Sequence, residues 1–379
     1  MTGSSCTESA AVRLRAAFDR AERMTVGVED ELMLLDPDTL DLSPRAPELL
    51  ERTAGDPRFK LELPAAQLEI VSPPLVSVAD VRAFLGEARR DLAAAADGLV
   101  RLAAAGVHPF AAPEGEVNPG ERYDRTVEAF GRAARRQLVF ALQVHVAVPA
   151  AERALAVYNA LRSYLPELLA LSANAPFHAG QDTGLATVRP KIAEQLPRQG
   201  VPPSISSWER FADELDWGAR IGAVHDPRVW WWELRPHPIH GTIEVRVPDA
   251  QTTVREAAAI AAVVHALVAW LARRHDARDL PPPVPSWRIE ENRWAALRDG
   301  VHGQLADLAT GEQVPTGERL GLLLAELAPV AAELGCAAEL AAAEELLAGT
   351  GADRQREHAR GADLRAVVED LVHRFCVEP

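Results

Sequence analysis

The sequence predicts an α+β fold with a mainly antiparallel sheet. Several long segments have the period of a helix, and alanine and leucine, which favour helices, fill them. Short β-rich runs lie among these segments without the regular strand–helix–strand alternation of a parallel sheet. In these runs polar and apolar residues alternate, as they do in strands that bury one face.

The elements can be placed in chain order. Strands are predicted at roughly residues 25–35, 60–71, 139–148, 229–235 and 241–247. Helices are predicted at roughly residues 9–23, 78–105, 121–138, 150–172, 252–275, 316–348 and 353–375. Because strand signals end near residue 248, we expect the last third of the chain to pack as helices against the sheet.

The chain is expected to form a single domain, 1–379. In it the sheet occupies about residues 24–250, and a helical C-terminal part occupies about residues 251–379. The proline-rich stretches 197–203 and 281–286 are the only candidate linkers, and no internal repeat is visible.

Composition and charge narrow the class of partner. Of the 379 residues 48% are hydrophobic and 25% are charged, which is typical of a soluble globular protein. A net charge of −15 disfavours nucleic acid and anionic membranes as partners. The N-terminus lacks a hydrophobic signal core, and the apolar stretch 257–272 is short, rich in alanine and interrupted by His265, so we expect a buried helix. The widely spaced cysteines fit a reducing cytoplasm without disulfides: Cys6, Cys336 and Cys376.

Each predicted strand carries polar residues on one face. In GVEDELMLLD (27–36), Glu29 and Glu31 point the same way, while Asp30 points to the other face and is expected to matter little. A solvated face would explain any one strand, but lysine is absent from all five faces, which together favour a functional face. The pairs on the other four strands are Gln67 and Glu69, Gln143 and His145, Glu233 and Arg235, and Glu244 and Arg246.

This set of side chains suits metal-dependent phosphoryl transfer. Clustered carboxylates are stable when divalent cations neutralise them, and Mg²⁺ and Mn²⁺ prefer such oxygen ligands. Arginine supplies bidentate contacts to phosphate or carboxylate. The sequence has no P-loop, no dinucleotide-binding glycine motif and no H-E-x-x-H or G-x-S-x-G motif, so a nucleotide would bind to the sheet through metal ions.

Seven segments in order, from about residue 24 to beyond residue 300, resemble the type-2 glutamate–cysteine ligase family of carboxylate–amine ligases. They are TVGVEDELMLLDPDTLDL, LPAAQLEIVSPP, GVHPFA, LQVHVAVP, LLALSANAPFHAGQDTGLATVRP, WWELRPHPIHGTIEVRVPDAQTTV and ENRWAALRDG. The resemblance implies a glutamine-synthetase-like fold, in which a curved antiparallel sheet holds ATP and Mg²⁺ (or Mn²⁺) on its concave face and helices pack outside. It also implies a reaction: ATP phosphorylates a carboxylate such as the γ-carboxylate of glutamate. An amine such as cysteine then attacks the acyl phosphate to give an amide.

By position, the resemblance assigns six metal ligands and two arginines, and Arg189 is a further candidate. Arg235 and Arg246 are expected to contact the ATP phosphates and stabilise the transferring phosphoryl group, and Arg189 is expected near the cofactor or substrate. The expected metal ligands are Glu29, Glu31, Glu62, Glu69, His145 and Glu244. On this basis Glu29→Ala or Glu244→Ala is expected to abolish ATP turnover and leave the fold intact.

Several of these residues have structural alternatives. Glu62 and Arg189 are also compatible with the surface, His145 with a structural histidine, and Asp182 with a turn. Three further histidines are candidate pocket residues that are not expected to bind metal: His178, His237 and His302.

The expected substrate loops depart from the family. SANAPFH and DTGLATVR stand where relatives often read S-A-N-S-P-F-W and D-T-G-Y-A-S-Y-R, and RPHP replaces a frequent R-P-S-P. The acid and the amine therefore stay open, as does a homo-oligomeric state, which is common among relatives. Two other functions also stay open: a metal-dependent phosphatase or kinase on the same sheet, and a non-catalytic descendant that binds a nucleotide or amino acid.

Overall fold

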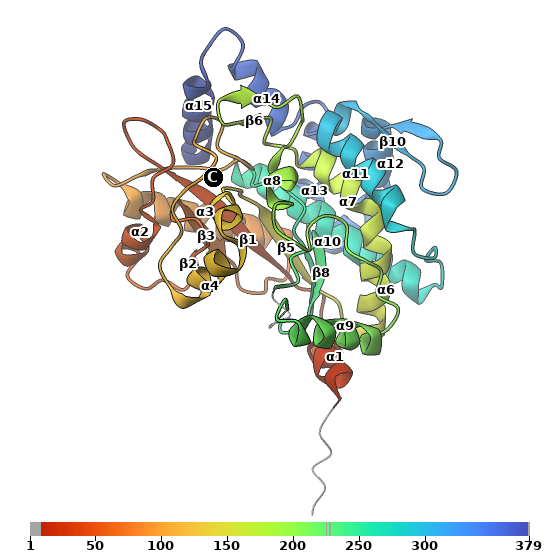
Figure 1. Ribbon diagram of the computed structural model, residues 1–379. Coiled ribbons are helices and arrows are strands. Elements are labelled where there is room, and N and C mark those ends of the chain that lie inside the picture. Colours follow the sequence, from red (N-terminus) through yellow and green to blue (C-terminus); the bar gives the residue numbers. More distant parts are fainter. Residues whose placement is uncertain (1–8, 225, 227–228, 378–379) are drawn as a thin grey trace, which may run out of the picture.

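The computed structural model describes residues 9–377, apart from 225, 227 and 228. Its main sheet has the strand order β2-β3-β1-β5-β9-β8, with β4 also paired to β1 (Figure 1). Every pairing in this sheet is antiparallel, which confirms the predicted α+β fold. The strands are β1 (Val26–Leu35), β2 (Phe59–Leu61), β3 (Gln67–Val71), β4 (Arg101–Ala103), β5 (Leu142–Ala147), β8 (Leu234–His237) and β9 (Thr242–Val245).

Helices surround the sheet. Those of the first part of the chain are α1 (Ala10–Arg20), α2 (Ala46–Arg52), α3 (Val78–Ala96), α4 (Glu121–Phe130), α5 (Arg132–Arg135), α6 (Ala151–Leu161), η1 (Arg162–Tyr164), α7 (Leu165–Leu171), α8 (Arg189–Ala193) and α9 (Trp208–Arg220). Those of the last part are α10 (Val254–Asp276), α11 (Ser286–Asp299), η3 (Gly300–His302), α12 (Thr316–Glu333), α13 (Ala337–Glu345), α14 (Gly351–His358) and α15 (Leu364–Val377).

The apolar face of the sheet packs against α3, α6 and α10. The side chains of Val28, Ile70, Val144 and Val245 lie on this face and are almost fully buried. Helix α10 is apolar around most of its circumference, as a helix in the middle of a core must be. It is long and apolar enough to cross a membrane, but 83% of its most apolar window is buried inside the protein, which agrees with the predicted buried helix.

Asp30 is the exception on the apolar face, and the expectation that it matters little is wrong. Its carboxylate lies 2.8 Å from Nη2 of Arg89 on α3, and both side chains are buried. Arg89 also donates to the backbone carbonyls of Gln251 and Thr252, just before α10. The pair therefore ties β1, α3 and the start of α10 together.

Replacing Arg89 is expected to destabilise the fold. In Arg89→Met the Asp30 carboxyl and two backbone carbonyls lose their buried partner, which should lower the free energy of unfolding by about 3–5 kcal/mol. Urea unfolding measures this change, with the neighbouring exposed residue as the control in Arg90→Met. The double variant Asp30→Leu/Arg89→Met should recover part of the loss, and a single variant as stable as wild type would contradict this role.

Several predicted boundaries are wrong because glycines end the helices early. The predicted helix 316–348 divides into α12 and α13 at Gly335, which has a φ of 71°. The predicted helix 121–138 divides at Gly131, with a φ of 56°, into α4 and α5. Likewise, 78–105 ends at Ala96 and continues into β4, and 353–375 divides into α14 and α15. The predicted strand 229–235 is largely wrong, because β8 begins at Leu234.

Several helices and strands of the structure were not predicted from the sequence. The helices α2, α8, α9 and α11 are short or strongly polar, and the last third of the chain does contain strands. These are β10 (Gln304–Ala306) and β11 (Gln313–Pro315), a separate hairpin, and β6 (Phe177–His178) and β7 (Gln181–Asp182) form another in the middle of the chain.

The two proline-rich stretches are loops that Arg162 ties to the same place in the fold. Arg162, buried at the end of α6, donates from Nε to the carbonyl of Pro202 and from Nη2 to the hydroxyl of Ser286. One hydrophobic cluster contains residues from Ala11 to Phe375. We therefore infer that the chain is one domain.

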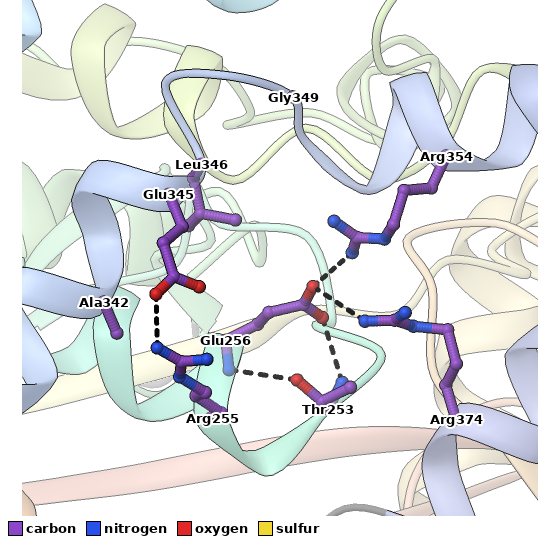
Figure 2. A pocket seen from close by; sticks show the side chains of 9 residues that line it. All are labelled: Thr253, Arg255, Glu256, Ala342, Glu345, Leu346, Gly349, Arg354 and Arg374. Atoms are coloured by element: carbon purple, nitrogen blue, oxygen red, sulfur yellow. Dashed lines mark hydrogen bonds and ion pairs between the residues drawn. The ribbon is translucent and has the colours of Figure 1, made fainter.

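Ion pairs attach the C-terminal helices to the start of α10. A cavity of about 200 Å³ lies there, and Figure 2 shows the charged side chains that line it. Glu256 contacts Arg354 of α14 and Arg374 of α15, and Arg255 contacts Glu345 of α13. Because these charges are mutually paired, we assign this cavity a structural role.

Candidate active site

Strand register brings the polar residues of five strands to one face of the sheet. Residues directly opposite each other on paired strands share a face. Glu31 on β1 is opposite Glu69 on β3, and Glu29 is opposite Gln143 on β5. His145 is opposite Glu244 on β9, which is in turn opposite Arg235 on β8. We call this side of the sheet, with Glu29, Glu31, Glu69, Gln143, His145, Arg235 and Glu244, the polar face.

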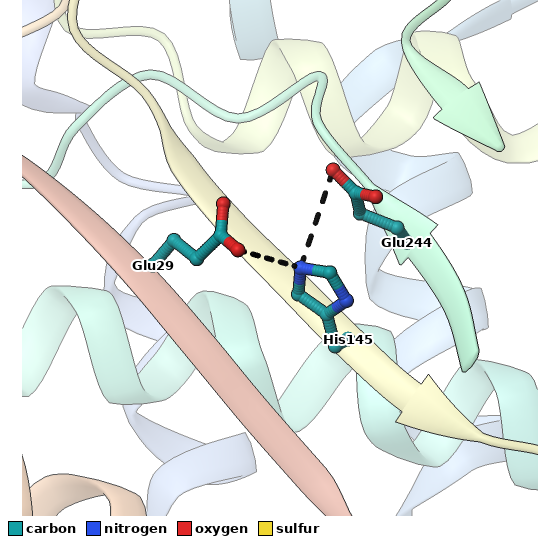
Figure 3. A group of neighbouring side chains, drawn as sticks. All are labelled: Glu29, His145 and Glu244. Carbon is teal, nitrogen blue, oxygen red and sulfur yellow. Dashed lines mark ion pairs between the residues drawn. The ribbon is translucent and has the colours of Figure 1, made fainter. Parts of the chain in front are cut away.

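Glu29, His145 and Glu244 form the centre of the polar face (Figure 3). Nε2 of His145 lies 3.3 Å from Oε1 of Glu29 and 4.0 Å from Oε1 of Glu244. Its Nδ1 lies 3.1 Å from the hydroxyl of Thr242, which orients the ring so that Nε2 points at the two carboxylates. One ligand atom from each residue lies within 4.8 Å of the others, so the trio fits a divalent cation.

Glu244 is held ionised by its neighbours. Burial opposes its charge, but the guanidinium groups of Arg235 and Arg246 and the His145 ring outweigh burial and hold the pKa of this carboxyl well below its usual range. Arg235 and Arg246 each contact one carboxylate oxygen of Glu244. Burial lowers the pKa of His145, but the carboxylates of Glu244 and Glu29 outweigh burial and raise it.

The other end of the polar face is acidic and poorly neutralised. Burial raises the pKa of Glu31 to about 7, and Glu62 adds to the rise. Burial also raises the pKa of Glu69 well above its usual value, and the charges of Glu29, Glu62 and Glu31 raise it further. The contacts of Glu31 come from Gln143, at 2.8 Å, and from the backbone N–H of Ala141, at 2.6 Å. Carboxylates that repel one another in this way favour cation binding.

Glu62 follows β2 and lies at the acidic end. Its side chain is 23% exposed, and burial and Glu29 raise its pKa against the opposing charge of Arg122. It therefore lies beside the expected metal ligands rather than on open surface.

The side chains of Arg246 and Arg235 lie on the polar face, whereas Arg189 contacts the chain that follows β9. Arg246 contacts both Glu244 and the amide oxygen of Gln143. Arg189 is buried; it donates from Nε to Asp249 at 2.7 Å and from Nη2 to the carbonyl of Val247. The surface alternative for Arg189 is wrong, and its contacts are those of a residue that positions the chain after β9.

Of the remaining candidate residues, one lies near the polar face and three lie elsewhere. Asp182 accepts from the backbone N–H of Gly184, as expected of a turn residue, and pairs with Arg356 of α14. His302 pairs with Asp353 at 3.1 Å, and His178 is half-buried in the β6–β7 hairpin. His237 does lie near the polar face, with its ring centroid 5.7 Å from that of His145.

Two further residues lie near this site and were not predicted from the sequence. His240, in the turn between β8 and β9, stacks on His237 with ring centroids 4.3 Å apart. Its only sequence signal is the spacing in RPHPIHG. Tyr123, on α4, donates from its hydroxyl to the carbonyl of Leu61 at 2.7 Å, and no local pattern indicated this contact.

Known proteins share this fold and much of this sequence. The chain is 40% identical over 365 residues to a protein of Rubrobacter xylanophilus named "Putative glutamate--cysteine ligase 2-3", covering 94% of this chain and 99% of that one. It is 37% identical over 368 residues to "Putative glutamate--cysteine ligase 2" of Thermobifida fusca, covering 94% and 92% of the two chains.

Solved structures with little sequence identity have a similar fold. A glutamate–cysteine ligase of Francisella tularensis, solved in complex with AMP, superposes with a TM-score of 0.68 at 12% identity, covering 94% of this chain and 88% of that one. A bifunctional glutathione synthetase of Pasteurella multocida gives a TM-score of 0.65 at 14% identity, with 96% and 53% covered.

The family model described as glutamate-cysteine ligase family 2 matches residues 25–370, which include every residue of the polar face. The chain belongs to glutamate-cysteine ligase family 2.

Proposed function

We propose that the protein is an ATP- and Mg²⁺-dependent carboxylate–amine ligase that forms a γ-glutamyl-type amide through an acyl phosphate. The observation that carries this proposal is the Glu29–His145–Glu244 trio, within 4.8 Å, beside Arg235 and Arg246. This combination suits phosphoryl transfer, because its catalysis consists mainly of positioning and charge neutralisation. The AMP bound to the Francisella tularensis enzyme supports a nucleotide site on this fold.

The polar face offers a role for each expected residue. The ions would be held by Glu29, Glu31, Glu62, Glu69, His145 and Glu244. When bound, Mg²⁺ or Mn²⁺ would neutralise charge on the ATP phosphates. Arg235 and Arg246 would stabilise charge on the transferred phosphoryl group. For Arg189 we propose positioning of the segment after β9 in place of a direct nucleotide contact, because Asp249 and Val247 occupy its side chain.

The reaction needs no nucleophile from the protein. The substrate carboxylate attacks the terminal phosphorus of ATP, and ADP leaves. The amine nitrogen then attacks the acyl carbon, inorganic phosphate leaves with the electrons of the broken C–O bond, and one amine proton is lost. We propose small-molecule acid and amine substrates in the cytoplasm, with glutamate and cysteine, which the relatives' names contain, as the first pair to test.

The test is phosphate release from ATP and Mg²⁺ across a matrix of amino acids and amines, with mass spectrometry of every active well. A product with the mass of acid plus amine minus water is the expected result and identifies both substrates. Phosphate release that needs neither acid nor amine would instead favour the phosphatase alternative, and ADP with a phosphorylated acceptor would favour the kinase alternative. Mg²⁺-dependent ATP binding without turnover in any well would favour the non-catalytic alternative.

Cation binding is expected to strengthen as pH rises through neutrality. The folded pKa of Glu31, about 7, lies above its usual 4.5, so the stability from its protonation is complete below about pH 4.5 and is lost as pH rises through 7. A divalent cation needs the ionised carboxylate. We therefore expect saturating MgCl₂ to raise the unfolding temperature more at about pH 8 than at about pH 6. Glu31→Gln should weaken this dependence in differential scanning fluorimetry, and an increment independent of pH would contradict it.

A further inference from the structure

Helix α4 has an amphipathic sequence, yet none of its residues is buried. Its half-buried residues are Tyr123, Thr126, Val127 and Phe130, which recur every three or four positions and therefore lie on one side. A helix with such a face normally buries it against a core. The side of α4 that faces the protein is instead only partly covered.

The contacts of α4 place it across the polar face. At its start, the Tyr123 hydroxyl donates to the carbonyl of Leu61 on β2. Burial raises the pKa of Tyr123 to about 12, and the negative charges of Glu62 and Glu69 contribute, so the phenol lies near the acidic end. At its end, the Phe130 ring meets the Trp231 ring edge to face, with centroids 5.7 Å apart.

These two contacts lie at opposite edges of the sheet. β2 is one edge strand, and Trp231 lies in the loop that leads into β8, the other edge strand, with Trp232 and Glu233 in between. In Figure 1, α4 is drawn in front of the strands. The helix thus lies on the polar-face side of the sheet, at the acidic end near Glu62 and Glu69, and we call it the roof.

Hydrogen bonds hold the chain before α4 and at the end of α5, while a glycine flanks each end of α4. Before α4, the Asn118 amide donates to the carbonyls of Glu62 and Pro64. At the last residue of α5, the carbonyl of Arg135 accepts from the N–H of Gly115 at 2.9 Å. Gly120 and Gly131, which flank α4, have φ values of 138° and 56° that other residues adopt only with strain. The roof is thus a separate helix, and a glycine at each end connects it to chain that hydrogen bonds hold in place.

We propose that Phe130 and Trp231 close the roof over the acyl phosphate and exclude water, so that an amine and not water takes the acyl group. This inference rests on the proposed ligase function. Attack by an amine breaks the acyl C–O bond, forms a C–N bond and yields an amide and hydrogen phosphate. Attack by water breaks the same bond, returns the acid with hydrogen phosphate and a proton, and wastes one ATP. Excluding water from a reactive intermediate is a known effect of closed sites.

The first test is the ratio of phosphate released to amide formed, with the acid and amine that wild type condenses. Wild type should release about one phosphate per amide, and Phe130→Ala and Trp231→Ala should raise the ratio roughly threefold or more. Trp217→Ala, which removes an exposed tryptophan from α9, is the matched control and should keep the wild-type ratio. The proposal would be overturned if both variants kept the wild-type ratio of phosphate to amide, so that the two products fell together.

A second test does not depend on the ligase reaction. Arg122 and Arg125 on α4 are 76% and 59% exposed in their side chains, so trypsin can reach them when the helix is released from the site. Mg²⁺ with a non-hydrolysable ATP analogue should protect both sites in wild type and protect them less in Phe130→Ala. If no acid and amine pair gives an amide, the proposed function fails, while protection would still support the roof. Equal cleavage with and without the analogue would overturn the roof.

Discussion

Glu29→Gln is expected to lower metal-dependent ATP turnover by roughly 10³-fold, because a lost metal ligand removes several kcal/mol of charge stabilisation from the transition state. The substitution keeps the shape of the side chain and removes its charge. The Glu29 carboxylate lies 3.3 Å from Nε2 of His145 and is 24% exposed, so we expect the fold to depend on it much less than on the fully buried Glu244. The unfolding temperature should therefore stay within about 2 °C of wild type.

The measurement is phosphate release as a function of Mg²⁺ concentration, alongside thermal unfolding. Glu22→Gln, at an exposed glutamate just before β1, is the matched control and should leave both quantities unchanged. Turnover within about threefold of wild type in Glu29→Gln would remove Glu29 from the metal site.

Glu244→Ala is expected to impair both activity and stability, which refines the sequence-based expectation that the fold stays intact. Glu244 is fully buried and contacts Arg235 and Arg246. Its removal leaves two guanidinium groups without their carboxylate in a buried setting, which should lower the free energy of unfolding by about 3–5 kcal/mol. Activity should fall as in Glu29→Gln, because the same trio loses a ligand.

Glu244→Gln separates the two effects. Glutamine keeps the volume and one acceptor oxygen for an arginine, so it should recover part of the lost stability and little of the activity. Glu51→Ala, at an exposed glutamate on α2, controls for the substitution itself. Wild-type stability in Glu244→Ala, measured by urea unfolding, would show that this carboxylate does not hold the arginines.

The fold class and the polar face could be predicted because both depend on local patterns. Alternation along a strand fixes which residues share a face, so Glu29 and Glu31 could be paired from the sequence. The structure adds the register that sets Glu31 opposite Glu69 and His145 opposite Glu244, which depends on how separate strands align.

What the sequence could not show depends on distant partners. The buried partner of Asp30 is Arg89, which lies 59 positions away and has no pattern that links the two. Arg189 is equally unmarked, because its partner Asp249 lies 60 positions away. The face of α4 reads as an ordinary core-facing helix face, and only the contacts of Tyr123 and Phe130 reveal that it lies over the site.

The central claim is that ATP activates a carboxylate, and oxygen transfer tests it most directly. Glutamate labelled with ¹⁸O in its γ-carboxylate, or the equally labelled acid that the substrate matrix identifies, is incubated with ATP, Mg²⁺ and the amine. An acyl phosphate leaves one carboxylate oxygen on the phosphate, so the released phosphate should carry one ¹⁸O for each amide formed. Amide formation with unlabelled phosphate would contradict the mechanism.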